Sequence, residues 1–380
     1  MTLLAASAST PCTSLWSWPF AAATGLAVGV ILSRAVRPLL DPLPGDANRR
    51  RSVIVLGGIA ALASWWWEAH RMAILPIDSP VPGCDVTALR FVAHMILGGF
   101  LAAAAWTDLR HRVIPDAITV PGVLAGLAWN TLFPSTLLPI TREVARSFAP
   151  PTLEADVLGA FGGLTTVGVP SGLGSAPAWT GLIAAGVAFV LWWWVGLPPN
   201  EPQPLALRPA SPRLDPRWLA AAGGAVGIAA AWLTGGPHWA GLVTALVGLI
   251  GAAGMIWATR IGASLALGRE AMGFGDVTLM AMVGSWIGWQ ACVLVCMLGV
   301  FIGLVHGLSQ LLRHAESELP FGPSLCLGTV VVMLGWRQLW AASGPQFDRP
   351  LELATVVALV IGLTAVTLWA WQRLRGGAAE

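Results

Sequence analysis

Two aspartates stand at the ends of long apolar stretches in a chain that has few charges. Asp108 closes an apolar run in "AAAAWTDLRHR", and Asp276 opens another in "GFGDVTLMAMVG". Two carboxylates brought together in a partly dry site tend to share one proton, so that one acts as a base on water and the other as an acid toward a carbonyl. Asp108 and Asp276 are therefore a candidate catalytic pair, with the chemistry that aspartic proteases use.

The positions of the two aspartates in the predicted helices suggest different roles. We expect Asp276 to cap a helix N-terminus, where the helix dipole favours a charged carboxylate, and Asp108 to lie at a helix C-terminus. Asp276 would then be the ionised base and Asp108 the proton carrier, although Arg110 and Arg112 act in the opposite sense. The alternative is that Asp276 is an N-cap and nothing more.

Three further residues near the pair are candidates for supporting roles. Gly273 and Gly275 have no side chains, which permits unusual backbone angles and the close approach of an extended substrate strand. Asp116 follows Pro115 at the start of another predicted helix. An N-cap is the simpler interpretation of Asp116, and a supporting place near the site is the alternative.

Two histidines lie within apolar runs, where ionisable groups are candidates for function. Hydrogen-bonded packing inside a helical bundle is the simpler interpretation of His94 and His306. The competing hypothesis is a proton-coupled transporter or channel in which both histidines and both aspartates form a relay. The five cysteines include no C-x-x-C pair, so we expect no metal site, no disulfide framework and no cofactor.

The composition is that of an integral membrane protein. Of the 380 residues, 56% are hydrophobic and only 11% are charged, with a mean hydropathy of +0.72, whereas an average soluble domain has roughly 25% charged residues. The net charge of +2 excludes the strongly basic surface of a nucleic-acid-binding protein.

Apolar runs of about the length that a bilayer requires predict an all-α, polytopic membrane helical bundle with about eleven transmembrane helices. We expect these helices near residues 18–37, 53–69, 89–107, 117–133, 178–197, 218–234, 239–259, 278–289, 291–312, 321–341 and 352–372. A turn at Gly288 to Gln290 is expected to join two of them as a tight helical hairpin. The Pro-rich and Gly-rich segments 134–177 and 198–217 are expected to be loops.

The distribution of arginines predicts the orientation of the chain. Cytoplasmic loops collect basic residues, and an external N-terminus places most of the arginines on the inner side. It also brings the segments 108–116, 260–277 and 313–320 to the same membrane face, so both aspartates are expected there.

Three segments together carry a family likeness. "TDLRHRVIPDAITVPG" (107–122), "GREAMGFGDVTLMAMVGSWIGWQ" (268–290) and "LPFGPSLCLG" (319–328) resemble the type IV prepilin peptidases, which are membrane aspartic proteases of the G-x-G-D kind. The likeness extends over about residues 90–133 and 239–341.

This resemblance implies a substrate and a place for the reaction. Asp108 and Asp276 would cleave the leader peptide from a prepilin or pseudopilin at the cytoplasmic face of the bacterial inner membrane, without a metal. The segment Pro320, Phe321, Gly322 and Pro323 resembles a family loop that lines the site. The expected partners are these precursors and membrane lipid, with no nucleic acid.

The resemblance also implies a division of the chain. We expect N-terminal spans with a short cytoplasmic loop, the first half of the peptidase core, an insertion of loops and extra spans, the second half of the core, and a C-terminal span with its tail. These parts correspond to residues 1–88, 89–133, 134–238, 239–341 and 342–380.

The sequence departs from the family in three ways. The family's cysteine-rich zinc loop is replaced by the short segment "RPLLDPLPGDANRRRS", so we expect no N-methyltransferase activity. Thr278 stands where a lysine is common, which removes a positive charge near Asp276. The third departure is the insertion at 134–238. Together, the first two keep open the alternative of an inactive homologue that acts in pilus or secretion-system assembly.

Overall fold

The computed structural model describes residues 17–35, 46–76, 81–139, 143–144, 147–148, 179–196, 216–268, 270, 272–312, 321–348, 355–359, 362 and 366. The predicted all-α class is confirmed. Within the described residues, β structure is confined to a minimal antiparallel pair, β1 (Glu143–Val144) with β2 (Ser147–Phe148).

Helices account for the rest of the regular structure. They are α1 (Ser17–Ala35), α2 (Asp46–Trp65), α3 (Cys84–His111), α4 (Asp116–Leu132), α6 (Trp179–Gly196), α7 (Pro216–Thr234), α8 (Gly236–Leu267), α9 (Phe274–Leu312), α10 (Gly322–Leu334) and α11 (Trp336–Ser343). A π-helical turn η2 (Trp66–His70) extends α2, and the 3-10 turns η3 (Pro134–Thr136) and η6 (Gly344–Asp348) follow α4 and α11.

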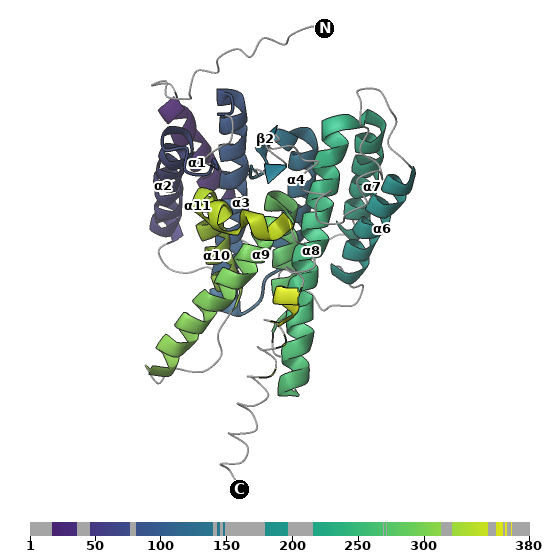
Figure 1. Ribbon diagram of the computed structural model, residues 1–380. Helices are drawn as coiled ribbons and strands as arrows, with labels where there is room; N and C mark the ends of the chain where they lie inside the picture. Colours follow the sequence, from purple (N-terminus) through teal and green to yellow (C-terminus); the bar gives the residue numbers. More distant parts are fainter. Residues whose placement is uncertain are drawn as a thin grey trace.

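The helices are arranged around α8 and α9, which contact each other most extensively. Helices α3, α4 and α10 pack on α9, while the pair α1–α2 lies against α3 on one flank and the pair α6–α7 lies against α8 on the other (Figure 1). The C-terminal parts of α8 and α9 project beyond the other helices at the lower end of the view.

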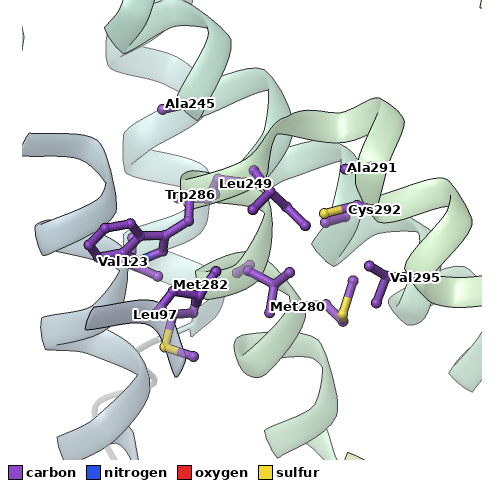
Figure 2. Packing of buried hydrophobic residues seen from close by; sticks show 14 of the residues in the cluster. Leu97, Val123, Ala245, Leu249, Met280, Met282, Trp286, Ala291, Cys292 and Val295 are labelled. Carbon is purple, nitrogen blue, oxygen red and sulfur yellow. The ribbon is translucent and has the colours of Figure 1, made fainter. Parts of the chain in front are cut away.

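Buried side chains from four helices meet in the core. Figure 2 shows Leu97 of α3, Val123 of α4, Leu249 of α8 and Met282 of α9 pointing toward one another. Where α8 and α9 cross, a side chain on Gly248 would collide with the backbone carbonyl of Gly284. Small residues of this kind let membrane helices approach closely, because lipid provides no hydrophobic force between them.

Helix α9 is a hairpin with its reversal at Gly288. That residue has φ 80° and ψ 169°, which is not helical. A straight helix would separate Asp276 from Gly303 by about 40 Å. Instead, both lie near the start of α10, since a Cβ atom added to Gly303 would lie 3.3 Å from the Phe321 ring and Asp276 interacts with Asp108, which contacts Gly322. The predicted hairpin is therefore confirmed.

A side chain of α4 stabilises the break in α9. The backbone carbonyls of Ser285 and Trp286 lose their helical partners because the helix stops at Gly288. The side-chain amide of Asn130 donates to both of them, at 2.7 and 3.2 Å. In return, the Trp286 indole N–H donates to the Gly122 carbonyl at 2.9 Å, so the reversal is tied to α4 from both sides.

The predicted span at 321–341 is not one continuous helix. Helices α10 and α11 form a pair that is bent by 86° at Gly335, which separates them in the chain. The buried Trp336 fixes the second piece, since its indole N–H donates to the Pro139 carbonyl at 2.7 Å. The apolar run therefore continues past the end of α10, but its direction changes.

The multi-pass membrane character is confirmed, whereas the predicted number of eleven spans is not. By length and composition, four helices among the described residues are able to cross a membrane, and the bent pair α10–α11 gives a possible fifth. Helices α6 and α7 contain shorter apolar segments. Most of the predicted span at 352–372 lies outside the described residues.

One cysteine differs from expectation. Cys84, at the start of α3, is disulfide-bonded, although no disulfide framework was predicted from the cysteine spacing. Cys292, Cys296 and Cys326 are free. The bonded cysteine and Asp108 lie at opposite ends of the same helix.

The hairpin geometry predicts the effect of Gly288→Ala. The φ and ψ of Gly288 fall in a region that is essentially restricted to glycine, so the variant should lose about 1–3 kcal/mol of stability. Thermal unfolding of the detergent-solubilised protein measures this loss. Gly254→Ala is the matched control, because a side chain there meets no atom within 4 Å. Equal melting temperatures for the two variants would contradict the assignment of the turn.

Candidate active site

Asp108 lies in the last turn of α3 and is buried. The helix ends because Arg112 adopts a left-handed conformation (φ 55°), and its N–H donates to the Asp108 carbonyl at 2.8 Å. Beyond this cap, the short segment 113–115 leads directly into α4. The predicted position at a helix C-terminus is therefore confirmed.

Asp276 is also buried, but it is not the N-cap that was predicted. Helix α9 begins two residues earlier at Phe274, so Asp276 lies inside the first helical turn. The first turn still exposes unpaired backbone N–H groups and the positive end of the helix dipole, which favours a carboxylate there. The helix dipole therefore still favours a charged Asp276, although this residue lies inside the first turn and does not cap the helix.

A third helix end meets the two aspartates. Gly322 begins α10, and its N–H donates to the Asp108 carboxylate. A side chain on Gly322 would collide with Asp108 Oδ2 and come within 2.9 Å of Ile114 Cδ1. The C-terminus of α3 thus meets the N-termini of α9 and α10, and the contact with α10 requires glycine.

The two carboxylates are close enough to interact electrostatically. Asp108 Oδ2 is buried and has no hydrogen-bond partner among the described residues, and neither aspartate forms an ion pair within that part of the chain. Two such carboxylates favour holding one proton between them. The arrangement is chemically able to deprotonate water and to protonate a carbonyl oxygen.

Ile114 is part of this site and was missed in the sequence. It is buried between the starts of α9 and α10, where it approaches both Gly275 and Gly322. A side chain on Gly275 would come within 3.1 Å of the Ile114 Cβ atom. The available signal was the apolar pair of Val113 and Ile114 that follows the basic run of Arg110, His111 and Arg112.

The glycines before Asp276 matter because they lack a side chain, and not because their backbone angles are unusual. Neither Gly273 nor Gly275 has a positive φ, so that expectation is wrong for both. Gly275 makes room for Ile114, while Gly273 is exposed and its nearest neighbour would lie 4.0 Å from an added Cβ atom. Of these two glycines, only Gly273 leaves space for another polypeptide chain to approach.

Arg260 of α8 holds the segment that leads into α9, and it too was missed. Its guanidinium donates to the Met272 carbonyl at 2.9 Å and pairs with Glu270. It also lies over the Phe274 ring, 5.6 Å from the ring centre. These contacts fix the backbone just before Asp276, whereas sequence analysis had treated Arg260 only as one charge of an inner loop.

The other predicted residues lie at the starts of α4 and α10. Asp116 is the first residue of α4, after the N-cap Pro115. Phe321 immediately precedes α10 and its ring packs on Gly303, while Pro323 is in the first turn of α10. Pro320 lies outside the described residues.

Thr278 follows Asp276 in α9 and is buried. Its hydroxyl donates to the Gly275 carbonyl at 3.0 Å, within its own helix. The residue therefore places no charge beside the aspartates, and its polar atom is used locally.

Among the described residues, His94 forms no relay with the two aspartates. His94 lies about 21 Å along α3 from Asp108, and its Nδ1 atom is paired with Glu68 at 2.8 Å. The side chain of His306 lies outside the described residues. Among the residues that are described, no group of His, Cys, Asp and Glu is able to hold a metal ion.

Residues 213–308, which include Asp276, match the type IV leader peptidase family. This part of the chain is similar to that family. The resemblance to type IV prepilin peptidases that the three sequence segments carry is thereby confirmed. The matched range contains neither Asp108 nor α10, so their place beside Asp276 rests on the geometry described above.

Several known proteins are similar to this chain, and each is named a prepilin leader peptidase/N-methyltransferase. The protein of Aeromonas salmonicida (strain A449) is 34% identical over 110 residues, which cover 25% of this chain and 38% of that protein. The protein of Stutzerimonas stutzeri is 38% identical over 114 residues (29% and 39%), and that of Pseudomonas aeruginosa 36% over 104 residues (27% and 36%).

The chain spans less than two fifths of the length of these relatives. No solved protein structure matches the chain.

The convergence of the helix ends predicts a cross-link. In a Cys326→Ser background, which removes the free thiol of α10, Asp108→Cys combined with Asp276→Cys should be joined by a short reagent that links two thiols. Asp85→Cys with Asp276→Cys is the control, because Asp85 is exposed at the other end of α3. Intact-mass measurement detects the bridge. A bridge that forms equally in both pairs, or only in the control, would contradict the arrangement.

Proposed function

We propose that this chain is a membrane aspartic endopeptidase that removes the leader peptide from type IV prepilin or pseudopilin precursors. The observation that carries the proposal is the meeting of two buried carboxylates, from α3 and α9, beside the N-terminus of α10. The family match around Asp276 and the printed names of the relatives support the same activity and the same class of substrate.

The proposed mechanism uses the two aspartates in opposite protonation states. Asp276, in the first turn of α9, is the charged partner and takes a proton from the attacking water. Asp108 carries the shared proton and gives it to the carbonyl oxygen of the scissile bond. The resulting diol collapses as one of its hydroxyl groups returns a proton to Asp108 and the proton held by Asp276 passes to the leaving amine, which restores the pair.

The surroundings of the pair suit a substrate that is half in water and half in lipid. Asp108 and Asp276 lie at the ends of long apolar helices, so the scissile bond is cut at the membrane boundary. Gly273 leaves its backbone open to an extended strand. A polar leader is then bound outside the membrane, and the apolar helix that follows it remains among the lipid chains.

We infer that this end of the molecule faces the cytoplasm of a bacterial inner membrane. The exposed residues Arg110, His111 and Arg112 follow Asp108 directly, and basic residues collect on the cytoplasmic side. Cys84, at the other end of α3, is disulfide-bonded, and disulfides persist in oxidising compartments outside the cytoplasm. Both observations favour the same orientation.

The proposal excludes N-methylation of the product. The short segment after the first predicted span has no cysteine and therefore no means of holding zinc through thiolates. The name of the relatives includes an N-methyltransferase activity, so the two functions are separable by experiment. We expect the mature substrate to carry a free, unmethylated N-terminal amine, measured as the mass of its N-terminal peptide.

Removal of either carboxylate tests the peptidase directly. Coexpression with a pilin-like precursor should give leader cleavage for the wild type and a loss of more than about a thousandfold for Asp108→Asn or Asp276→Asn, because each variant lacks one half of the acid–base pair. Gel mobility and mass spectrometry of the precursor measure cleavage. Processing that survives both substitutions would sink the protease assignment, and an inactive wild type would favour an assembly role.

The start of α10 provides a second test of the same site. Gly322→Ala pushes a methyl group against the Asp108 carboxylate and should lower the cleavage rate more than roughly tenfold, since small displacements at reacting groups are costly. Gly98→Ala is the matched control, because it lies on α3 and an added side chain meets nothing within 4 Å. If both variants cleave at the wild-type rate, α10 has no part in positioning Asp108.

A further inference from the structure

A second group of buried charges lies at the end of α3 that is opposite Asp108. His94 Nδ1 and Glu68 Oε1 are 2.8 Å apart, and these side chains are only 8% and 4% exposed. Arg90, 6% exposed, donates to the carbonyls of Thr136 and Ser135, both at 3.3 Å. These three charged side chains, which we call the Glu68 cluster, take no part in the proposed peptide cleavage.

The Glu68 cluster lines a pocket. Glu68 and Arg90 form its polar wall, and much of the rest is apolar, from Met72, Ile74, Leu75, Val81 and Pro82. The pocket has an empty volume of about 390 Å³ and is partly open to the outside. The site therefore combines two opposite charges with an apolar surface.

One carboxylate oxygen in this cluster has no partner. Glu68 Oε1 is paired with His94, whereas Glu68 Oε2 is buried and makes no hydrogen bond within the described part of the chain. A buried, unsatisfied carboxylate oxygen is costly, so a hydrogen-bond donor is required there. The donor has to be a small group, because the Glu68 side chain that it must reach is only 4% exposed.

The depth of the pocket indicates where the donor comes from. Arg90 and Asp108 are on the same helix, and the helical rise places them about 27 Å apart along its axis. This length is close to the hydrocarbon thickness of a bilayer, about 30 Å. With Asp108 at one membrane boundary, the Glu68 cluster lies at the level of the lipid headgroups of the opposite leaflet.

We propose that this pocket binds the headgroup of an aminophospholipid of the phosphatidylethanolamine type. The primary ammonium of the lipid donates to Glu68 Oε2, its phosphate lies toward the Arg90 guanidinium, and its acyl chains follow the apolar wall. The opposite charges of Glu68 and Arg90 match those of the zwitterion. A choline headgroup is excluded, because its trimethylammonium group has no N–H to donate to Glu68 Oε2.

This proposal is independent of peptidase activity, so its test needs no substrate. The delipidated full-length protein is mixed with phosphatidylethanolamine or phosphatidylcholine of identical acyl chains, and bound lipid is counted by native mass spectrometry. We expect roughly tenfold tighter retention of the ethanolamine lipid, the effect of one hydrogen bond to a charged group. Equal retention of the two lipids would overturn the proposal.

Variants separate headgroup recognition from general folding. Glu68→Gln keeps a hydrogen-bonding group for His94 but loses the charge, and should bring the preference to about one to one. Val81→Trp, at an exposed position of the pocket wall, should block entry and have the same effect. Asp85→Asn is the control, because this exposed carboxylate lies near the same end of α3, and it should keep the preference.

Three further outcomes would count against the lipid. Free ethanolamine that competes as strongly as the whole lipid would assign the pocket to a soluble amine. A high-resolution structure with only a water molecule on Glu68 Oε2, in a protein saturated with the ethanolamine lipid, would also overturn the proposal. A preference that survives Glu68→Gln would do the same.

Discussion

The contact between the first residue of α10 and the Asp108 carboxylate is the constraint on which the rest of the site depends. Gly322 donates its N–H to that carboxylate, and Ile114 fills the space between Gly322 and Gly275. Neither contact leaves room for a side chain on the glycines. The ends of α3, α9 and α10 are therefore fixed relative to one another by backbone shape, and this arrangement brings the two aspartates together.

The elements around this contact hold it from two directions. Arg260 of α8 pairs with Glu270 and donates to the Met272 carbonyl, and these contacts hold the segment that precedes α9. Asn130 of α4 holds the other end of the first α9 segment by bonding the carbonyls left free at the reversal. The contacts of Asn130 are buried and that of Arg260 with the Met272 carbonyl is half-buried, so water competes little with them, and the segment that carries Asp276 is fixed at both ends.

The sequence pattern predicted that the two aspartates lie at helix ends, and it predicted the hairpin at Gly288. These features depend on the length and hydropathy of each apolar run and on the position of a glycine, which are local properties of the sequence. The pattern failed where the direction of a helix, or a contact between segments distant in the sequence, determines the structure. The bend at Gly335 lies inside a continuous apolar run, so hydropathy gave no sign of it. The pairing of His94 with Glu68, and the role of Ile114, depend on segments far apart in the sequence, and a single sequence carries no record of such contacts.

The short helices of the site have a consequence for the surrounding lipid. The 13 residues of α10 extend only about 20 Å, less than the hydrocarbon core of about 30 Å. Beyond the end of α10, stacked rings of Trp336, Trp340 and Phe347 continue the protein, and Trp289 joins them from the α9 turn. The hydrophobic thickness of the protein therefore varies around its perimeter. We expect the depth of the two aspartates in the membrane to depend on the thickness of the bilayer.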